Sequence, residues 1–253
     1  MDSRKISLLL PSAYRSRSLR EAIEAALNST DMPLEICVSI VNDDPESAIA
    51  VRDFPIVLDV RSVAEYGRGA VYAWNKLFQR STGDIVALWA DDLRPEHGWL
   101  THALDALDKI GGHGLVGLND LSSDGNEYAA HWLADRAFIE NELGGVMYPP
   151  QYHGWWADRE VTDIAKALGC YRWARRALVE HLNYSFGKSK FDRTYRDAAQ
   201  HYDADRQTYI QRKANGFAHD WNDHESAAVL SAESETASPV AQNRRKHPKT
   251  SVD

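Results

Sequence analysis

The chain of 253 residues contains only two cysteines, Cys37 and Cys170, which lie far apart in the sequence. Isolated cysteines argue against a disulfide-stapled secreted domain and favour reduced thiols in a cytosolic protein. No apolar run approaches the ~20 residues that a membrane-spanning helix needs. The apolar stretch within residues 1–14 is too short for a secretory signal. We therefore expect a cytoplasmic protein with no membrane partner.

An overall positive charge is also lacking, since the formal net charge is −8. Taken alone, this value argues against a nucleic-acid partner. The charge is unevenly distributed, however, because residues 165–215 contain eleven Lys and Arg against five Asp and Glu, a local charge of +6. A basic zone of this kind can bind a polyanion while the whole chain stays acidic.

Apolar runs alternate with amphipathic segments through the first 110 residues. Ser18, followed by Glu21, is expected to cap the first helix. The alternation indicates βαβ units and an α/β fold with a mainly parallel sheet. The expected strands are 5–14, 34–44, 55–62 and 84–92, and the expected helices are 18–30, 70–81 and 97–110.

Polar side chains stand where several of these strands end. Ligands of such sheets bind beyond the carboxyl ends of the strands. The residues that fall at that edge are Ser12, Asp43, Asp44, Asp91 and Asp92. We therefore expect the principal site there.

The pattern is less regular after residue 112. From residue 226 the chain has few large apolar residues and is rich in Ser, Ala and charge, which predicts a disordered tail over 226–253. Before it, strands are expected within 114–120 and 127–136, helices at 136–145 and 160–169, a strand or mixed element at 171–182 and one long polar helix at 192–214.

Three stretches carry a recognisable order of motifs: "ISLLLPSAYRSRSLREAIEAAL" (6–27), "EICVSIVNDD" (35–44) and "GAVYAWNKLFQRSTGDIVALWADD" (69–92). Together they resemble a family 2 glycosyltransferase with the GT-A fold, over about residues 5–200. The likeness is greatest to the short phage-encoded members of that group. It implies one domain over 1–225, with a Rossmann-like nucleotide-sugar half (1–112), an acceptor half (113–225) and a mostly parallel central sheet flanked by helices.

The resemblance also implies a nucleotide-sugar donor, with UDP-sugar favoured, and the positions that would contact it. Arg68 could reach phosphate, although a solvated loop arginine is equally consistent with the sequence. Trp89, which stands where the family has an acid, is grouped with the donor site. The donor-site positions carried over from the family are Pro11, Ser12, Arg15, Asp43 or Asp44, Arg68, Asn75 and Trp89.

Carboxylates at a strand end can hold a divalent ion that stabilises a departing diphosphate. The family motif is Asp-any-Asp, and the matching triplet here is Trp89-Ala90-Asp91, so the resemblance implies that Asp91 is a metal ligand. His181 matches a further family ligand, and its imidazole suits Mn²⁺ better than Mg²⁺. The alternatives are that Asp91 and Asp92 cap a helix and that His181 is a packed residue.

A second matching pattern is "GWWADREVTDIAKALG" (154–169), in which Asp158 stands eleven residues before Gly169. The resemblance implies that Asp158 is the general base of an inverting reaction, which takes the proton from the acceptor hydroxyl. The alternative is an ordinary helix N-cap. Trp155 and Trp156 could line the acceptor site, or could belong to the core.

Arginine and lysine are interleaved with aromatic residues over 171–196, which favours a phosphate-backbone polymer as acceptor. The phage likeness suggests double-stranded DNA with a hydroxymethylated pyrimidine, modified in the host cytoplasm. A saccharide or lipid-linked glycan is the alternative acceptor. Two other functions stay open: a non-catalytic nucleotide-sugar binding protein, and a nucleotidyltransferase, although no glycine-rich loop follows the first strand.

Overall fold

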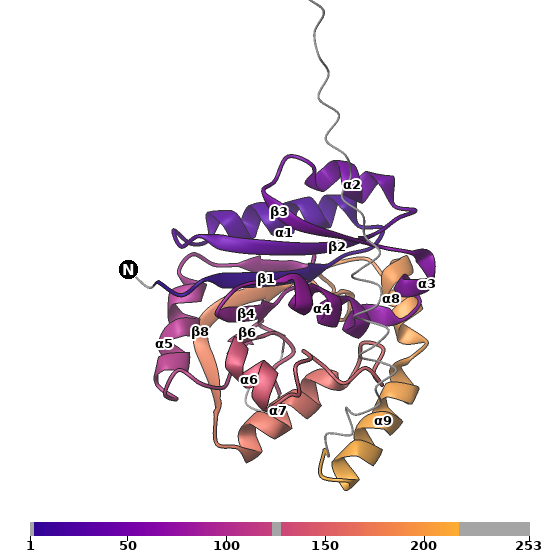
Figure 1. Ribbon diagram of the computed structural model, residues 1–253. Coiled ribbons are helices and arrows are strands. Elements are labelled where there is room, and N and C mark those ends of the chain that lie inside the picture. The colour runs from indigo at the N-terminus through magenta and orange to yellow at the C-terminus, as the bar shows by residue number, and fades with distance from the viewer. Residues whose placement is uncertain (1–2, 123–127, 218–253) are drawn as a thin grey trace, which may run out of the picture. The chain divides into compact units, whose positions relative to one another are not determined.

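Eight strands form one sheet in the computed structural model of the protein, which describes residues 3–122 and 128–217 (Figure 1). All of these residues belong to one unit, Met1–His219. The predicted tail, 226–253, lies outside the described residues. The strands are β1 (Ile6–Pro11), β2 (Leu34–Val41), β3 (Ile56–Arg61), β4 (Ile85–Leu88), β5 (Leu93–Pro95), β6 (Leu115–Asn119), β7 (Trp132–Asp135) and β8 (Tyr171–His181).

The strand order is β3-β2-β1-β4-β7-β6-β8-β5. The first four strands of that order are parallel, as predicted. Strand β7 is antiparallel to both of its neighbours, because it follows β6 through a connection without a helical crossover in the described residues. Strands β6 and β8 are parallel again, whereas the short β5 pairs antiparallel with the end of β8. The sheet is therefore mixed in its second half.

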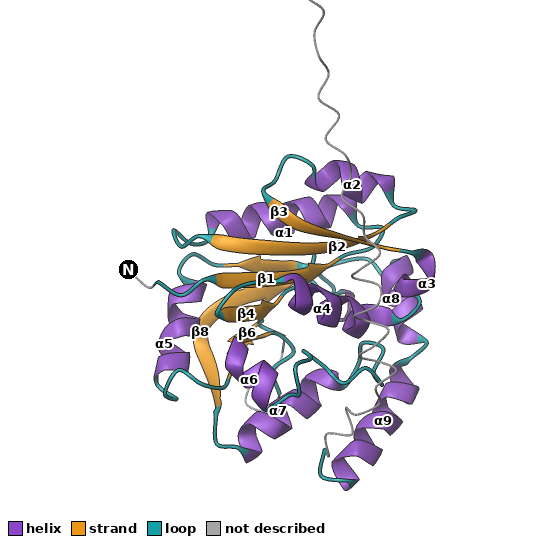
Figure 2. Ribbon diagram, viewed as in Figure 1, coloured by secondary structure: helices purple, strands orange, loops and turns teal. Residues whose placement is uncertain are grey.

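Helices cover both faces of this sheet (Figure 2). On one face α1 and α5 contribute to a core cluster, and on the other face α4, α6 and α7 contribute to a second cluster. The helices are α1 (Ser16–Asn28), α2 (Pro45–Val51), α3 (Val63–Tyr66), α4 (Gly69–Arg80), α5 (Trp99–Asp108), α6 (Arg136–Asn141), α7 (Ala157–Ala167), α8 (Arg193–Ala199) and α9 (Tyr202–Ala214), with a 3-10 turn η1 (Tyr184–Phe186).

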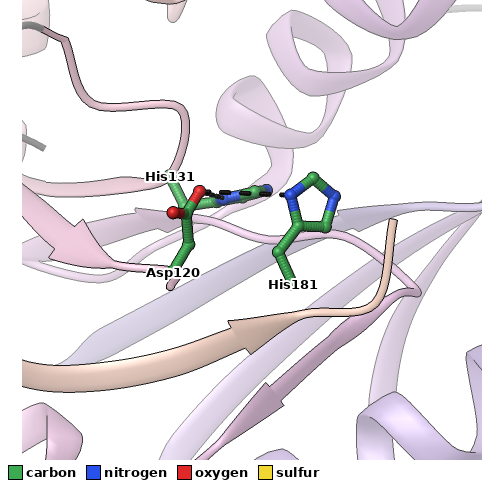
Figure 3. Close-up of side chains that lie close together, drawn as sticks. All are labelled: Asp120, His131 and His181. Carbon is green, nitrogen blue, oxygen red and sulfur yellow. Dashed lines mark hydrogen bonds and ion pairs between the residues drawn. The ribbon is translucent and has the colours of Figure 1, made fainter. Parts of the chain in front are cut away.

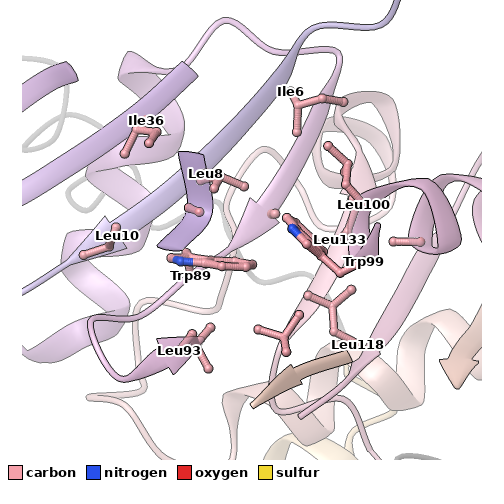
Figure 4. Close-up of a cluster of buried hydrophobic side chains, with 14 of the residues drawn as sticks. Ile6, Leu8, Leu10, Ile36, Trp89, Leu93, Trp99, Leu100, Leu118 and Leu133 are labelled. Carbon is pink, nitrogen blue, oxygen red and sulfur yellow. The ribbon is translucent and has the colours of Figure 1, made fainter. Parts of the chain in front are cut away.

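The first cluster contains Trp89, the residue that interrupts the acidic motif. Its ring is fully buried, and its centroid lies 4.8 Å from that of Trp99 on α5. Figure 4 shows it among Leu8, Leu10 and Leu93. Burial of a tryptophan contributes a large apolar area to a core. The side chain at position 89 therefore joins the sheet to α5.

Two local predictions are corrected by the structure, and two short helices are new. Helix α1 begins at Ser16 with Arg15 as its N-cap, so Ser18 lies inside the helix and caps nothing. The predicted long helix at 192–214 is two helices, α8 and α9, and the short helices α2 and α3 were not anticipated.

The division between α8 and α9 has a tertiary cause. The ring of His201, at the N-cap of α9, stacks on His153 at a centroid distance of 3.6 Å. The carboxylate of Asp205 accepts hydrogen bonds from the backbone N–H groups of His153, Gly154 and Trp155 at 2.7–2.9 Å. These contacts fix the direction of α9 and override the local preference for a continuous helix. No helix among the described residues is long and apolar enough to cross a membrane.

Candidate active site

The carboxyl ends of β1, β4, β6 and β8 meet at one edge of the sheet, and polar side chains from all four come together there. The hydroxyl of Ser12, after β1, donates to Asp91, after β4, at 2.6 Å. His181, the last residue of β8, places Nε2 at 3.3 Å from Asp92 and Nδ1 at 4.0 Å from Asp120, which follows β6. The edge predicted from the sequence therefore holds a continuous polar cluster.

Asp91 is buried, and its carboxylate already has partners. One oxygen accepts from Ser12, and the other lies 3.1 Å from the guanidinium of Arg15. Burial raises the pKa of Asp91, although the nearby Arg15 opposes the shift. Neither Asp91 nor Asp92 is the N-cap of the next helix, α5, whose N-cap is Gly98. The helix-cap alternative is therefore wrong.

Arg15 links the first loop to helix α8. Its Nε and Nη2 donate to the two oxygens of Asp192, the N-cap of α8, at 2.7 and 2.9 Å. Its guanidinium lies 4.0 Å from the ring centroid of Tyr195, whose hydroxyl donates to Asp92 at 2.7 Å. A fixed cation thus stands beside both acids of the motif.

Asp120, His131 and His181 form the centre of the cluster (Figure 3). Nδ1 of His131 lies 3.0 Å from Oδ2 of Asp120, and the two imidazole rings meet edge to face at 4.6 Å. Burial opposes ionisation of Asp120 and Asp92, but hydrogen bonds from the histidines and from Ser122 and Tyr195 together hold both pKa values below their usual range. The three nearest nitrogen and oxygen atoms lie within 4.8 Å of one another, so these side chains could hold a metal ion.

Backbone hydrogen bonds fix these segments relative to one another. The N–H of His181 donates to the carbonyl of Asp120 at 3.1 Å, and the N–H of Leu182 donates to the carbonyl of Asp92 at 2.8 Å. The positions of the acids and the imidazole are therefore set by the sheet itself, which is the rigidity that a catalytic site requires.

Asp158 lies in the first turn of α7, which begins at Ala157 with Trp156 as its N-cap. One of its oxygens accepts from the backbone N–H of Arg159 at 2.9 Å. Burial raises the pKa of Asp158 to about 6, and the charge of Asp120 adds to the increase. The N-cap alternative is wrong, and a carboxyl with a pKa near neutrality suits a general base.

The acids after β2 lie close to the first loop but have structural partners. Asp44 caps α2 through a bond from the N–H of Ser47 at 3.2 Å, and it also accepts from the N–H of Tyr14 at 2.6 Å. Asp43 is exposed and accepts from the Tyr14 hydroxyl at 2.6 Å. Of the two, Asp43 has the freer carboxylate for a ligand.

Two further predicted donor contacts lie near this edge. Pro11 ends β1 and is half-buried. The amide of Asn75, on α4, is buried and makes both of its hydrogen bonds with the backbone of Tyr148, at 2.8 and 3.1 Å. Asn75 therefore positions the loop before α7, and these two bonds hold its amide in place.

The remaining predicted contact residues, Trp89, Arg68 and Trp155, have partners outside the polar cluster. Trp89 is fully buried in the core, so the structure does not present its ring to a ligand. Arg68 is exposed, with its guanidinium 3.9 Å from the centroid of Tyr72. Trp155 donates to the carbonyl of Ala198 at 2.8 Å, so its indole N–H is used in attaching α8.

Trp156 also packs within the fold. Its ring lies 5.4 Å from that of Tyr209 and 5.9 Å from that of Tyr202, both on α9. Its backbone has a φ of 65°, in the left-handed region where a bulky residue is strained. These contacts therefore favour the alternative that Trp155 and Trp156 belong to the core.

Asp120 and His131 were not predicted from the sequence. Asp120 follows an apolar strand in the same way as Asp91, so the strand-end rule could have found it. His131 precedes β7 and has no local signal, because its partner is eleven residues away across a loop.

The curled α/β sheet, with helices on both faces and acids at its carboxyl edge, defines a protein of the GT-A class. The family model for glycosyl transferase family 2 matches residues 7–162, so the chain belongs to that family. The predicted fold and the family resemblance are confirmed. The likeness to phage-encoded members stays a prediction.

Solved structures support the fold over most of the chain. A mannosyltransferase from Pyrobaculum calidifontis in complex with GDP-Man and Mn²⁺ has a TM-score of 0.59 at 18% identity, covering 93% of this chain and 81% of its own. Glucosyl-3-phosphoglycerate synthase from Mycobacterium tuberculosis, in complex with Mn²⁺, UDP and phosphoglyceric acid, has a TM-score of 0.53 at 16% identity, covering 73% and 74%.

A curated relative is similar over a shorter region. Glucosyl-dolichyl phosphate glucuronosyltransferase from Haloferax volcanii is 30% identical over 98 residues. This alignment covers 38% of the chain and 31% of the relative. The similarity thus spans about a third of each protein.

Proposed function

We propose that the protein is an inverting glycosyltransferase that moves a sugar from a nucleotide-sugar to an acceptor hydroxyl. The observation that carries the proposal is Asp158, a carboxyl in the first turn of α7 whose pKa burial and the charge of Asp120 raise to about 6. In its ionised form it takes the acceptor proton as oxygen attacks the anomeric carbon, while the nucleotide diphosphate leaves from the opposite face.

The donor side is formed by the first loop and the acids after β4. Arg15 supplies a permanent positive charge beside Asp91 and Asp92, where the leaving diphosphate develops charge. A divalent ion, Mn²⁺ or Mg²⁺, supplies further neutralisation when it is bound. The family resemblance implies Asp91 and His181 as its ligands, and the Mn²⁺ in two structures of the same fold supports the choice of metal.

The leading acceptor is a saccharide or a lipid-linked glycan. The Haloferax relative is named for glucosyl-dolichyl phosphate, a lipid-linked sugar, which supports this class over DNA. The basic and aromatic residues of 171–196 are divided among β8, η1 and α8, and Lys188 pairs with Glu180 at 2.8 Å. They therefore do not follow a single element. Hydroxymethylated DNA and cytoplasmic location stay predictions.

The proposal is tested by offering a panel of UDP- and GDP-sugars to a glycan, a dolichyl phosphate-linked sugar and hydroxymethylcytosine DNA, with product analysis by mass spectrometry. We expect a mass gain of one sugar residue on a glycan or lipid-linked acceptor, lost on addition of EDTA and restored by Mn²⁺. Donor binding without any product would favour the non-catalytic alternative. A product on DNA alone would restore the first acceptor prediction.

The rate of transfer should fall as the pH is lowered through about 6. The raised pKa of Asp158 means that the base is half protonated there, so kcat/KM should decrease by about tenfold for each further pH unit. The profile is measured with saturating Mn²⁺, and with circular dichroism at each pH to exclude unfolding. A rate that stays constant down to pH 4.5 would show that no group of this pKa acts as the base.

A further inference from the structure

The usual metal-binding position of the acidic motif is poorly suited to a cation in this chain. The side chain at position 89 is a fully buried tryptophan, so one acid of the motif is missing. The carboxylate of Asp91 is buried and engaged by Ser12 at 2.6 Å and Arg15 at 3.1 Å. A second cation at Asp91 would compete with a guanidinium that Asp192 and Tyr195 hold in place.

The neighbouring cluster of Asp120, His131 and His181 is better suited to a cation. It contains two imidazoles, one carboxylate and no fixed cation. Asp120 and His131 are each 6% exposed, and they come from the ends of different strands together with His181. Figure 3 shows both imidazoles directed toward the carboxylate. Buried groups of this kind are costly unless they are paired with one another or with an ion.

Two of the distances between the donor atoms are close to those of an octahedral coordination shell, and one ligand atom from each residue lies within 4.8 Å of the others. Ligand atoms at ~2.1 Å from one ion lie roughly 3 Å apart when adjacent and roughly 4.2 Å apart when opposite. Oδ2 of Asp120 lies 3.0 Å from Nδ1 of His131 and 4.0 Å from Nδ1 of His181. The other nitrogen of His181 faces Asp92 at 3.3 Å, which orients the ring as a neighbouring carboxylate does in many metal sites.

We propose that the protein binds its divalent ion on Asp120, His131 and His181, in place of the Asp91 carboxylate. Two imidazoles and one carboxylate favour Mn²⁺ or another transition metal over Mg²⁺. The role of the ion in sugar transfer rests on the proposed function, whereas its binding does not. Arg15 and Asp91 then act as a fixed pair on the donor side.

The proposal is tested by titrating Mn²⁺ into the full chain, without nucleotide-sugar, and measuring the electron paramagnetic resonance signal of free Mn²⁺. The His131→Ala variant should raise the Kd by about tenfold or more. Asp91→Asn should change it far less. His97→Ala, which removes an exposed histidine, is the matched control and should bind Mn²⁺ as the unmodified chain does.

Loss of binding in Asp91→Asn with full binding in His131→Ala would overturn the proposal, and so would the absence of Mn²⁺ binding by the unmodified chain at millimolar metal. If thermal unfolding shows that His131→Ala is not folded, Asp120→Asn gives a second test. Retained Mn²⁺ binding by Asp120→Asn would also overturn the proposal. A chain that binds Mn²⁺ through His131 but transfers no sugar would contradict the proposed function and leave the metal site standing.

Discussion

Replacement of Asp158 by Asn should lower kcat by about 10²–10⁴-fold, because the amide cannot accept the proton of the acceptor hydroxyl. The substitution preserves the size of a side chain whose oxygen accepts from the N–H of Arg159, so the start of α7 should stay intact. Donor binding should also be retained, since the donor contacts lie on the first loop and beside the acids after β4. The measurements are initial rates of transfer and calorimetric binding of the nucleotide-sugar.

Asp163→Asn is the matched control for this prediction. Asp163 lies on the same helix, but its carboxylate faces α9, where it accepts from Tyr209 at 2.7 Å and Lys213 at 2.8 Å. The control should retain the normal rate. Full transfer by Asp158→Asn would remove Asp158 from its role as base, and equal losses in both variants would indicate a structural effect of α7.

Much of the donor half follows from sequence pattern alone. The strands β1, β2 and β4 are mostly apolar and buried, as expected for inner strands of a parallel sheet, whereas the edge strand β3 is partly exposed. Because such strands all end at one edge, Ser12 and Asp91 could be placed together before the structure was known. Their 2.6 Å hydrogen bond bears out that reasoning.

The roles of Asp91 and Asp92 could not be predicted from the strand pattern. The partners of Asp91 and Asp92 come from distant parts of the chain, since Arg15 is 76 positions from Asp91 and Tyr195 is 103 positions from Asp92. Asp192, which holds Arg15, is 177 positions from it. Sequence periodicity carries no information on such pairings. The role of Asp91 as a metal ligand therefore stays a prediction, and its pairing with Arg15 could not be foreseen.

Trp89 shows a second limit of prediction from the sequence. Its position in the motif suggested a residue facing the donor, but strand residues alternate between the two faces of a sheet. The alternation directs position 89 into the first core cluster, against α5. The tryptophan at this position of the motif is therefore part of the core. It does not belong to the polar cluster around His181.

A buried ion pair joins helix α9 to α7, and its removal should have a large effect on stability. Glu160 on α7 is fully buried and accepts from Arg212 on α9 at 2.8–3.1 Å, and from the Tyr152 hydroxyl at 2.7 Å. Arg212→Ala leaves a buried carboxylate without its cation, which should lower the free energy of unfolding by about 3–5 kcal/mol. Urea denaturation followed by circular dichroism measures this difference.

Lys213→Ala provides the comparison, because the adjacent Lys213 pairs with Asp163 at 2.8 Å while its side chain is 55% exposed. An exposed pair should contribute no more than about 1 kcal/mol. The double variant Glu160→Leu/Arg212→Leu should be more stable than Arg212→Ala, since it leaves no uncompensated charge. If Arg212→Ala and Lys213→Ala lowered the free energy of unfolding by the same small amount, the Glu160–Arg212 pair would not be a contact that holds α9. Since α9 also supplies Asp205 to the loop before α7, a large loss in Arg212→Ala should in addition reduce sugar transfer by displacing Asp158.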